Sequence, residues 1–518
     1  MKKVPVITAR EAAELVKDNM TLTSSGFVAS CMPEALTSAV EERFLETSSP
    51  KDLTVFYAAA QGNRDGSGAD HFAHEGLIKR VIGGHYNMVP KLGEMILANK
   101  IEGYNFPQGT LAQLYRDIAG HKLGTITHVG LNTFADPRIE GGKLNDITKE
   151  DLVEVIEVLG EEKLIYKSIH LDIGFIRGTY ADEYGNVTLD HEVASTEVTS
   201  MAQAVKNCGG KVVVQVEKVV KGGSLDPKLV KIPGIYVDYI VVAENKEDHE
   251  QCRGCEYDGA MSGEFKIPLD GGEAAKLDAK KIIGRRAALE LEENTVVNLG
   301  IGAPEYVATV ANEEGIGDYM TLTVEAGPIG GIPQGGAKFG GSVNPDCILD
   351  QPYQFDFYDG AGVDLAFLGL AQADSHGNIN VSKFGPRIAG CGGFINITQN
   401  AKKVFYCGTF TAGGLKTEVK DGKLVINQEG KSVKFLKDVE QITFSGEYAN
   451  KIKQPVMYIT ERAVFELKED GMHLVEVAPG IDVKTQVLDL MDFEPIIDGE
   501  PKLMDMRIFR DEVMGLKK

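Results

Sequence analysis

One short stretch of the sequence holds a residue that could act as a covalent catalyst. Residues 321–324 have strand character and lead directly into Glu325. The following loop has glycines at positions 327, 330, 331, 335 and 336, which allow the backbone to approach a ligand closely. In an open α/β sheet, ligands bind at the ends of strands beside such loops. We therefore interpret Glu325 as a nucleophile, although most glutamates at strand ends are only solvated.

A glutamate can attack an activated acyl group, such as a thioester, when its site is dry enough to raise its reactivity. The attack passes through an oxyanion, which requires backbone N–H donors of the kind that glycine turns present. The candidate turns are Gly300-Ile301-Gly302 and Gly390–Gly393, with Gly390, Gly392 and Gly393 as the candidate positions in the second. Taken alone, each turn is better explained as a tight connection between a strand and a helix.

Other catalytic motifs do not match. No G-x-S-x-G sequence occurs, and the P-loop-like end Gly430-Lys-Ser432 has Val425 where the first glycine belongs. Gly300–Gly302 lacks the third glycine of a dinucleotide-binding loop. The ten histidines show no metal-ligand spacing, and His71 and His74 are expected to share a solvated helix face. We predict no metal site.

The seven cysteines indicate free thiols in a reducing compartment, which predicts a cytoplasmic protein. Cys252 and Cys255 form a lone C-x-x-C in an acidic segment, where we expect solvated loop thiols; the sequence does not define a role for this pair. The net charge of −22 argues against nucleic acid or an anionic membrane as a partner. No apolar run is long enough to span a bilayer, and no signal peptide is expected.

The elements around these motifs occur twice. The series of helix, strand, glycine turn and Pro-Glu that starts at Arg10 occurs again from Arg285. The turn at residues 181–187 (Ala-Asp-Glu-Tyr-Gly-Asn-Val) matches residues 373–379 (Ala-Asp-Ser-His-Gly-Asn-Ile), and each copy lies between strand-like runs. Two matches in the same order indicate an internal repeat of two related halves.

This pattern predicts an α/β fold with two related open domains and mainly parallel sheets. The expected boundaries are residues 1–243 for the first domain, 244–280 for a linker and 281–518 for the second. After about residue 410, short β-runs such as 423–427 and 456–460 suggest an antiparallel appendage on the second half. Thr8 and Glu11 fit a capping box, and Asp482 fits the N-cap of a short helix near the C-terminus.

Several further motifs follow one another in a fixed order along the chain. In the first half they are residues 75–80 (Glu-Gly-Leu-Ile-Lys-Arg), 107–111 (Pro-Gln-Gly-Thr-Leu) and 142–151. In the second half they are residues 297–302, 323–327 (Thr-Val-Glu-Ala-Gly), 355–358 and 408–413. With these motifs the whole chain resembles a single-chain family I coenzyme A transferase, and is similar to bacterial propionate and acetate CoA-transferases.

The resemblance implies that Glu325 is the nucleophile of a ping-pong reaction. CoA would pass from a short-chain acyl-CoA, such as propionyl-CoA or acetyl-CoA, to a short-chain carboxylate through a glutamyl-CoA thioester. CoA would be a substrate, and no cofactor would be bound permanently. The resemblance also implies an oxyanion hole of backbone amides around Ile301 and Gly390–Gly392, an acyl pocket reached by Gln108, and a homotetramer.

Two alternatives stay open at this point. An acyl-CoA thioester hydrolase would use the same intermediate and discharge it with water. A non-catalytic binding module could use the same fold, because fold alone does not determine function. Nor does the sequence define which acids are exchanged, since one methylene contributes only ~1–3 kcal/mol to discrimination in an apolar pocket; acetate, propionate, butyrate, lactate and acrylate all remain candidates.

Overall fold

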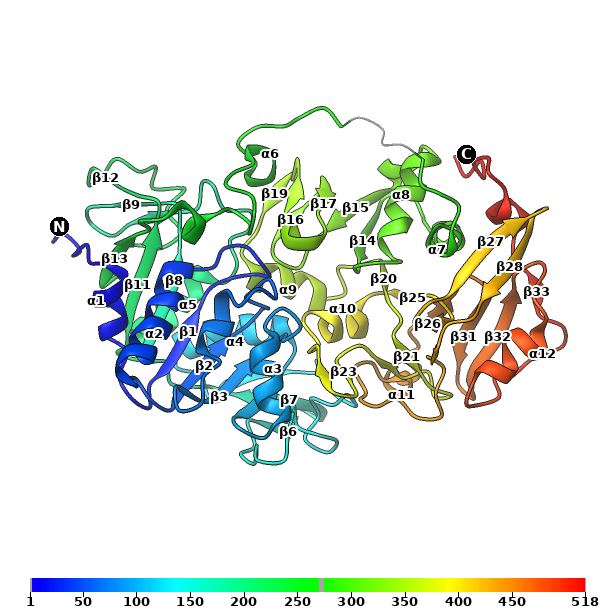
Figure 1. The fold of residues 1–518 in the computed structure, drawn as a ribbon, viewed down its shortest axis with the longest axis horizontal. Coiled ribbons are helices and arrows are strands. Elements are labelled where there is room, and N and C mark those ends of the chain that lie inside the picture. The colour runs from blue at the N-terminus through cyan, green and yellow to red at the C-terminus, as the bar shows by residue number, and fades with distance from the viewer. Residues whose placement is uncertain (1, 270–273, 518) are drawn as a thin grey trace. The chain divides into compact units, whose positions relative to one another are not determined.

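The computed structural model describes residues 2–269 and 274–517, so residues 270–273 of the expected linker lie outside the described residues. The chain forms two compact units (Figure 1). The first comprises Met1–Ile267, Val324–Asp356 and Phe384–Asn396, and the second comprises Pro268–Thr323, Phe357–Lys383 and Ile397–Lys518. Two segments of the second half thus belong to the first unit. The expected domain boundary at residues 244–280 stays a prediction about the related halves.

The first unit is built on a seven-stranded sheet in which all neighbouring strands are parallel. In sheet order the strands are β13 (Tyr239–Val242), β11 (Lys211–Val216), β8 (Ile173–Arg177), β1 (Thr21–Ser24), β2 (Leu53–Tyr57), β3 (Ile78–Gly83) and β4 (Glu102–Asn105). β2 and β8 are buried along their whole length. Such uninterrupted burial is typical of parallel sheets that are covered on both faces.

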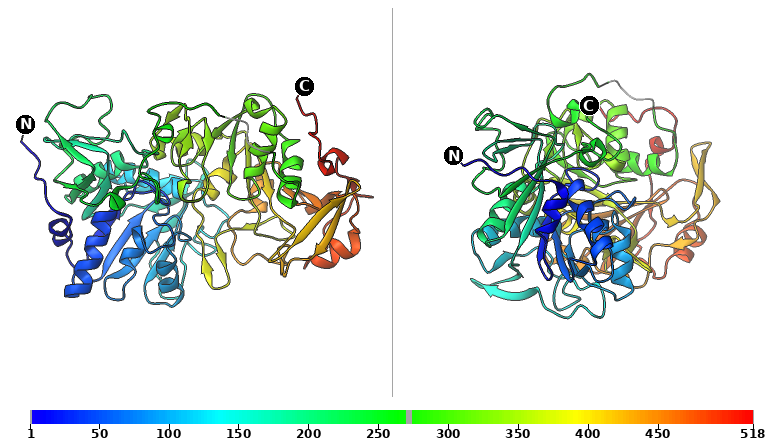
Figure 2. Two further views of the ribbon diagram at one scale, coloured as in Figure 1. Left: turned by 45° about the horizontal axis from the view of Figure 1, so that its top comes forward. Right: turned by 60° about the vertical axis from the view of Figure 1, so that its left-hand side comes forward.

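Helices pack beside this sheet (Figures 1 and 2). They are α1 (Ala9–Glu14), α2 (Glu34–Thr47), α3 (Pro90–Leu97), α4 (Gln108–Ala119) and α5 (Val198–Asn207). A further short helix of this unit is α6 (Gly259–Ser262). Leu36 of α2 and Leu92 of α3 share one core cluster with Val55 and Val81 of the sheet. α6 lies within the expected linker at residues 244–280, so this segment contains secondary structure.

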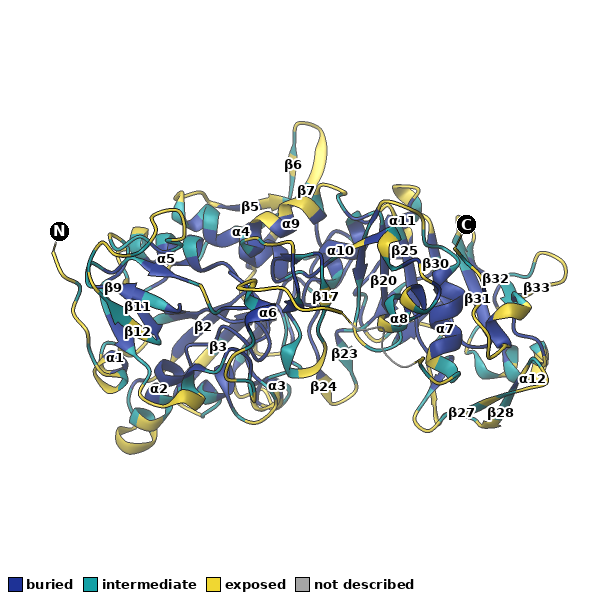
Figure 3. Ribbon diagram, turned by 90° about the horizontal axis from the view of Figure 1, so that it is seen from above, coloured by how far each residue is buried: buried dark blue, intermediate teal, exposed yellow. Residues whose placement is uncertain are grey.

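Small β-elements complete the first unit. β5 (Gly124–Thr127), β7 (Glu161–Lys167) and β6 (Val153–Val158) form an antiparallel sheet, whose β6–β7 end is exposed (Figure 3). The others are β9 (Tyr180–Asp182), β10 (Val187–Thr188), β12 (Lys218–Val220), β16 (Pro328–Ile329), β17 (Ile332–Pro333), β18 (Ser342–Val343), β19 (Cys347–Ile348) and β24 (Arg387–Ile388). Of these, β16 begins three residues after Glu325.

The second unit contains a mixed sheet. Its strands, in order, are β15 (Met320–Thr323), β14 (Thr295–Leu299), β20 (Leu365–Gly369), β25 (Lys403–Cys407), β30 (Val456–Ile459), β31 (Ala463–Lys468), β32 (Gly471–Val477) and β33 (Lys502–Leu503). The pairs from β15 to β30 are parallel, and β31 is antiparallel to both of its neighbours. The antiparallel appendage is confirmed. The run 456–460, which was expected to belong to it, forms β30, which is parallel to β25 and antiparallel to β31 and so joins the two parts of the sheet.

Helices and hairpins surround this second sheet. The helices are α7 (Ala279–Ala288), α8 (Glu305–Glu313), α11 (Gly446–Lys451) and α12 (Val483–Gln486). α9 (Gln351–Asp359), α10 (Phe394–Asn400) and β23 (Lys383–Phe384) contain residues of both units. The short strands are β21 (Gln372–Ala373), β22 (Ile379–Asn380), β26 (Thr411–Ala412), β27 (Lys416–Lys420), β28 (Lys423–Gln428) and β29 (Ser432–Val433). The α/β class is confirmed.

The repeated turn has the same hydrogen bonds in both units. Asp182 Oδ1 accepts from the backbone N–H groups of Tyr184 and Asn186, and the Asn186 amide donates to Asp182 Oδ2. Asp374 and Asn378 make the equivalent bonds in the second unit. The strand order β11-β8-β1-β2 likewise corresponds to β25-β20-β14-β15. The repeat seen in the sequence is therefore a repeat of structure.

Both predicted caps are confirmed: Thr8 and Glu11 form the capping box of α1, and Asp482 accepts from the Thr485 N–H at α12. His71 and His74, however, do not share a solvated face. The His71 ring binds Glu34 at 2.7 Å and Glu41 at 2.5 Å, and His74 binds Glu41 at 2.6 Å. The sequence could not show that α2 brings two carboxylates to this place.

Cys252 was expected to be a solvated thiol, which is wrong. It is fully buried, and its sulfur accepts a hydrogen bond from the Ser30 hydroxyl at 3.2 Å, while Cys255 is partly exposed. All seven cysteines are free. Along the described part of the chain, no helix is long and apolar enough to cross a membrane.

Candidate active site

Glu325 lies in a tight turn that follows directly after β15. The turn is closed by two backbone hydrogen bonds, from Gly327 N–H to the Val324 carbonyl at 3.0 Å and from Val324 N–H to the Pro328 carbonyl at 2.9 Å. The neighbours Val324 and Ala326 are buried in one apolar cluster with Phe27 and Val193. Because both neighbours are anchored, the backbone holds Glu325 in a defined position. Its side chain remains partly exposed.

Gly393 contacts the carboxyl group of Glu325. Its backbone N–H donates a hydrogen bond to Glu325. A Cβ atom on residue 393 would lie 1.9 Å from Glu325 Oε2 and 3.0 Å from the Phe355 ring, which is closer than atoms can approach. A side chain at position 393 would therefore displace the carboxyl group, which lies against the Gly393 backbone.

Burial raises the pKa of Glu325 to about 7, while the hydrogen bond from Gly393 acts in the opposite direction. A carboxylate that is poorly solvated is more basic and a better nucleophile than one in water. At neutral pH about half of the groups are ionised at this pKa. The protein therefore places a reactive carboxylate where part of its surface is still accessible.

The loop that carries Gly393 is fixed to the first sheet. Gly392 N–H donates to the Gly84 carbonyl at 2.7 Å, and Cys391 N–H donates to Asn105 Oδ1 at 2.9 Å. The Asn105 amide in turn donates to the Gly84 carbonyl at 2.7 Å. Gly390 and Gly392 have positive φ values of 82° and 52°. The loop is thus a rigid support for the Gly393 N–H.

Gln108, the expected acyl-pocket residue, lies beside the same loop at the first position of α4. Its backbone N–H donates to the Gly392 carbonyl at 2.9 Å, and only 2% of its surface is exposed. A Cβ atom on residue 392 would lie 3.7 Å from Gln108 Oε1 and 3.6 Å from His85 Cδ2. Within the described residues, the buried Gln108 Nε2 and His85 Nδ1 atoms have no hydrogen-bond partner.

The structure therefore brings together Glu325, Gln108 and the Gly390–Gly393 loop in the first unit. Asn105 and His85 belong to the same group, and neither was expected from the sequence. Asn105 is the last residue of β4, and His85 lies two residues after the end of β3. Polar residues at the carboxyl ends of consecutive parallel strands are the signal that could have identified them.

The other glycine turn belongs to the second unit. Gly302 N–H donates to the Glu305 carboxylate at 3.0 Å, and Gly300 N–H donates to the Phe367 carbonyl at 2.8 Å. Two of the candidate donors are thus already used. Ile301 is 58% exposed, and no acceptor for its N–H occurs among residues 2–269 and 274–517. Of this turn, only Ile301 presents a free donor, and its role as an oxyanion donor stays a prediction.

A second buried carboxyl group of the first unit has a raised pKa. Glu197, just before α5, is 1% exposed, and burial together with the charge of Asp350 raises its pKa to about 8. No other residue in the described part of the chain donates to either of its carboxyl oxygens. Across the same residues, no group of three His, Cys, Asp or Glu side chains is arranged to hold a metal ion.

Comparisons with known proteins match this chain to one family. Residues 6–243 match the family model described as Coenzyme A transferase. The acetate CoA-transferase YdiF of Escherichia coli K12 is 44% identical over 99% of this chain and 96% of its own length. The caffeate CoA-transferase of Acetobacterium woodii is 45% identical over 98% of both chains.

A solved structure is also similar to this chain over almost its whole length. The acyl-CoA transferase YdiF of E. coli O157:H7, in a thioester complex with CoA, superposes with a TM-score of 0.93 at 44% identity, covering 99% of this chain and 98% of that one. The chain belongs to the coenzyme A transferase family, and CoA transfer between acyl-CoA and carboxylates follows from this full-length similarity.

Proposed function

We propose that the protein transfers CoA from a short-chain acyl-CoA to a short-chain carboxylate through a glutamyl-CoA thioester on Glu325. A carboxylate oxygen of Glu325 attacks the thioester carbonyl, the C–S bond breaks, and CoA leaves as a thiolate. The product is an acyl-glutamyl anhydride. The thiolate then attacks the glutamyl carbonyl and displaces the first carboxylate, so that the thioester is stored on the enzyme. An incoming carboxylate reverses both steps, which makes the cycle ping-pong.

The contact between Gly393 and Glu325 is the observation that carries this proposal. When the thiolate attacks the glutamyl carbonyl, negative charge develops on the oxygen that accepts the Gly393 N–H. A preorganised donor at that oxygen stabilises the transition state, and removal of one such donor typically costs ~3–4 kcal/mol. The hydrogen bond that positions the nucleophile is therefore also an oxyanion donor for the second step.

We propose acetate and propionate as the exchanged acids. The acetate CoA-transferase among the relatives supports this choice, and the caffeate CoA-transferase shows that similar chains differ in substrate. Gln108 would face the acyl group, because its unpartnered Nε2 atom lies beside the loop that holds Glu325. We further propose that CoA is only a substrate, that no cofactor is bound permanently, and that the protein is a cytoplasmic homotetramer.

The test is intact mass spectrometry of the full chain after mixing with propionyl-CoA and no acceptor, followed by peptide mapping. The expected result is a CoA-sized adduct on the peptide that contains Glu325. The adduct should disappear when acetate is added, and Glu325→Gln should not form it. Glu197→Gln is the matched control, because Glu197 is another glutamate of the same unit whose pKa is raised by burial.

Other outcomes would identify another activity. Steady release of CoA without an adduct would indicate a thioester hydrolase. Intact propionyl-CoA with no adduct would show that the substrate class is wrong, and a panel of acyl-CoA donors would then follow. An adduct that persists in Glu325→Gln would contradict the assignment of the nucleophile.

A further inference from the structure

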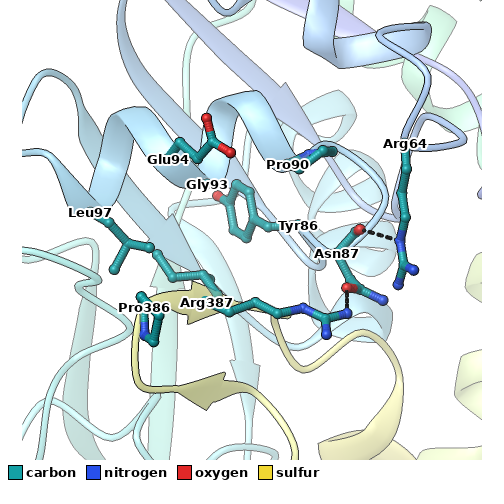
Figure 4. Close-up of a pocket in the computed structure, with 10 residues that line it drawn as sticks. Arg64, Tyr86, Asn87, Pro90, Gly93, Glu94, Leu97, Pro386 and Arg387 are labelled. Atoms are coloured by element: carbon teal, nitrogen blue, oxygen red, sulfur yellow. Dashed lines mark hydrogen bonds between the residues drawn. The ribbon is translucent and has the colours of Figure 1, made fainter.

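A cavity of about 290 Å³ lies beside α3 in the first unit (Figure 4). Arg64, Asn87 and Arg387 line one end of it, and Leu97, Pro386 and Ile388 are apolar lining residues. None of these residues belongs to the group formed by Glu325, Gln108 and the glycine loop. The cavity therefore combines a cationic end with an apolar wall.

The two arginines converge on one residue. Arg64 Nε donates to the Asn87 backbone carbonyl at 3.0 Å, and an Nη atom of Arg387 donates to the Asn87 side-chain oxygen, as the dashed lines in Figure 4 show. Each guanidinium keeps several N–H groups that Asn87 does not use. Asn87 thus holds two cations close to each other.

Neither cation is neutralised by the protein. Among residues 2–269 and 274–517, no carboxylate forms an ion pair with Arg64 or Arg387. The neighbouring Asp65 is paired with Arg253 at 3.2 Å, and Figure 4 shows the Glu94 carboxylate pointing away from Arg387. Two unpaired like charges side by side are unfavourable unless an anion joins them.

His85 lies two residues before Asn87, and the charges of both arginines act on it. Burial and the positive charges of Arg64 and Arg387 lower the pKa of His85 to about 4. His85 is therefore neutral near pH 7 and adds no third positive charge. Of the charged residues that line the cavity, Arg64 and Arg387 are the two cations and Glu94 is the one anion.

The cationic end and the apolar wall together indicate which class of ligand fits the cavity. A phosphate monoester carries a charge of about −1.5 to −2 at pH 7 and can neutralise both arginines, whereas a carboxylate neutralises one. The guanidinium fork matches phosphate oxygens in pairs. The volume is at the lower end of the roughly 300–1,000 Å³ of ligand pockets, so it would accept one end of a larger molecule. We propose that this cavity binds a phosphate monoester through Arg64 and Arg387, with the apolar wall against its organic part.

One wall of the cavity is formed by the start of the chain segment that supports the nucleophile. Ile388 lines the cavity, and the next carbonyl, that of Ala389, accepts from the N–H groups of both Tyr86 and Asn87 at 2.7 and 3.0 Å. The chain then runs on to Gly393, which donates to Glu325. A phosphate bound by Arg387 would fix the start of the segment whose end holds the nucleophile.

Isothermal titration calorimetry tests the proposal without using activity. Adenosine 3′,5′-bisphosphate and inorganic phosphate are titrated into the full chain, the variant R64Q/R387Q and the control Arg10→Gln. Arg10 is an exposed arginine that is paired with Glu46. We expect the parent and the control to bind the bisphosphate equally, and the double variant to bind at least tenfold more weakly. R64K/R387K, which keeps the charges, should retain part of the affinity.

Absence of binding to the parent, or equal binding to R64Q/R387Q, would overturn the proposal. An unchanged Tm of the double variant separates a lost site from a lost fold. Because Glu325 does not line the cavity, Glu325→Gln should bind the bisphosphate normally. This separates a failure of the phosphate site from a failure of the proposed function.

Steady-state kinetics distinguish the source of the phosphate. If it is the 3′-phosphate of CoA, which rests on the proposed function, R64Q/R387Q raises KM for acyl-CoA about tenfold. KM for acyl-dephospho-CoA and for the carboxylate then stays unchanged. If it is a separate phosphorylated molecule, KM for acyl-CoA does not change, and CoA does not displace the bisphosphate. Both results require the site, and they differ only in its occupant.

Discussion

Glu325 and Glu197 belong to the same unit, and desolvation raises the pKa of each carboxyl group, to about 7 and about 8. Their surroundings differ. Glu325 is partly exposed and accepts the Gly393 N–H, whereas Glu197 is 1% exposed and accepts from no other residue in the described part of the chain. A raised pKa is therefore not sufficient to define a nucleophile. Access for a substrate and a fixed donor for the developing charge distinguish Glu325.

The sharpest test of this comparison is to replace each carboxyl group by its amide. Glu325→Gln should reduce the rate of CoA-adduct formation by about 10³-fold or more, since it removes the nucleophile itself. Glu197→Gln keeps the shape of the neutral group and should change the rate by less than about threefold. Single-turnover mass spectrometry with propionyl-CoA measures both. Similar losses in the two variants would show that the comparison is wrong.

The hydrogen bond from the Gly393 N–H to Glu325 can be disrupted by adding a side chain at position 393. Gly393→Ala places a Cβ atom where Glu325 Oε2 lies, so the carboxyl group must move. Because a displacement of about 1 Å can cost roughly 10²-fold in rate, we expect a loss of that order. Gly120→Ala is the control, since position 120 has a negative φ and its nearest neighbour would lie at 3.5 Å. A fully active Gly393→Ala would contradict the contact.

The pKa of Glu325 predicts how the first half-reaction depends on pH. Only the ionised carboxylate attacks, so the rate of adduct formation should rise about tenfold between pH 6 and pH 8, with a midpoint near pH 7. Glu197→Gln should show the same profile, because Glu197 does not react. A flat profile over this range would indicate that a different group, or a different step, limits the rate.

The smallest expected effect concerns stability. The pKa of Glu325 is higher in the folded than in the unfolded chain, so the folded state is favoured below pH 4.5 and loses stability as the pH rises towards 7. Glu325→Gln removes this penalty and should be more stable than the parent at pH 8, by up to about 3 kcal/mol. The gain should vanish near pH 4. Thermal unfolding at both pH values measures it, and an equal Tm difference at pH 4 and pH 8 would contradict it.

Local features were predictable from the sequence because they depend on neighbouring residues. The caps at Thr8 and Asp482, the repeated Asp-x-x-Gly-Asn turns and the strand before Glu325 all follow from short patterns. The nearness of Gln108 and Gly392 to Glu325 was expected only from the family resemblance and not from short patterns, because it depends on hydrogen bonds between residues almost 300 positions apart. Cys252 was misjudged for the same reason, since Ser30 and its cluster bury it.

The division of the chain into units has a consequence for the gene. If the coding sequence were split after Ile267, the first product would lack Val324–Asp356 and Phe384–Asn396, which complete its compact unit. The second product would carry Glu325 without the strands that support the Gly393 loop. We therefore expect neither fragment to be active alone, and activity to return only when both are expressed together. The two halves therefore depend on each other, and their fusion in one coding sequence ensures that they are made in equal amounts.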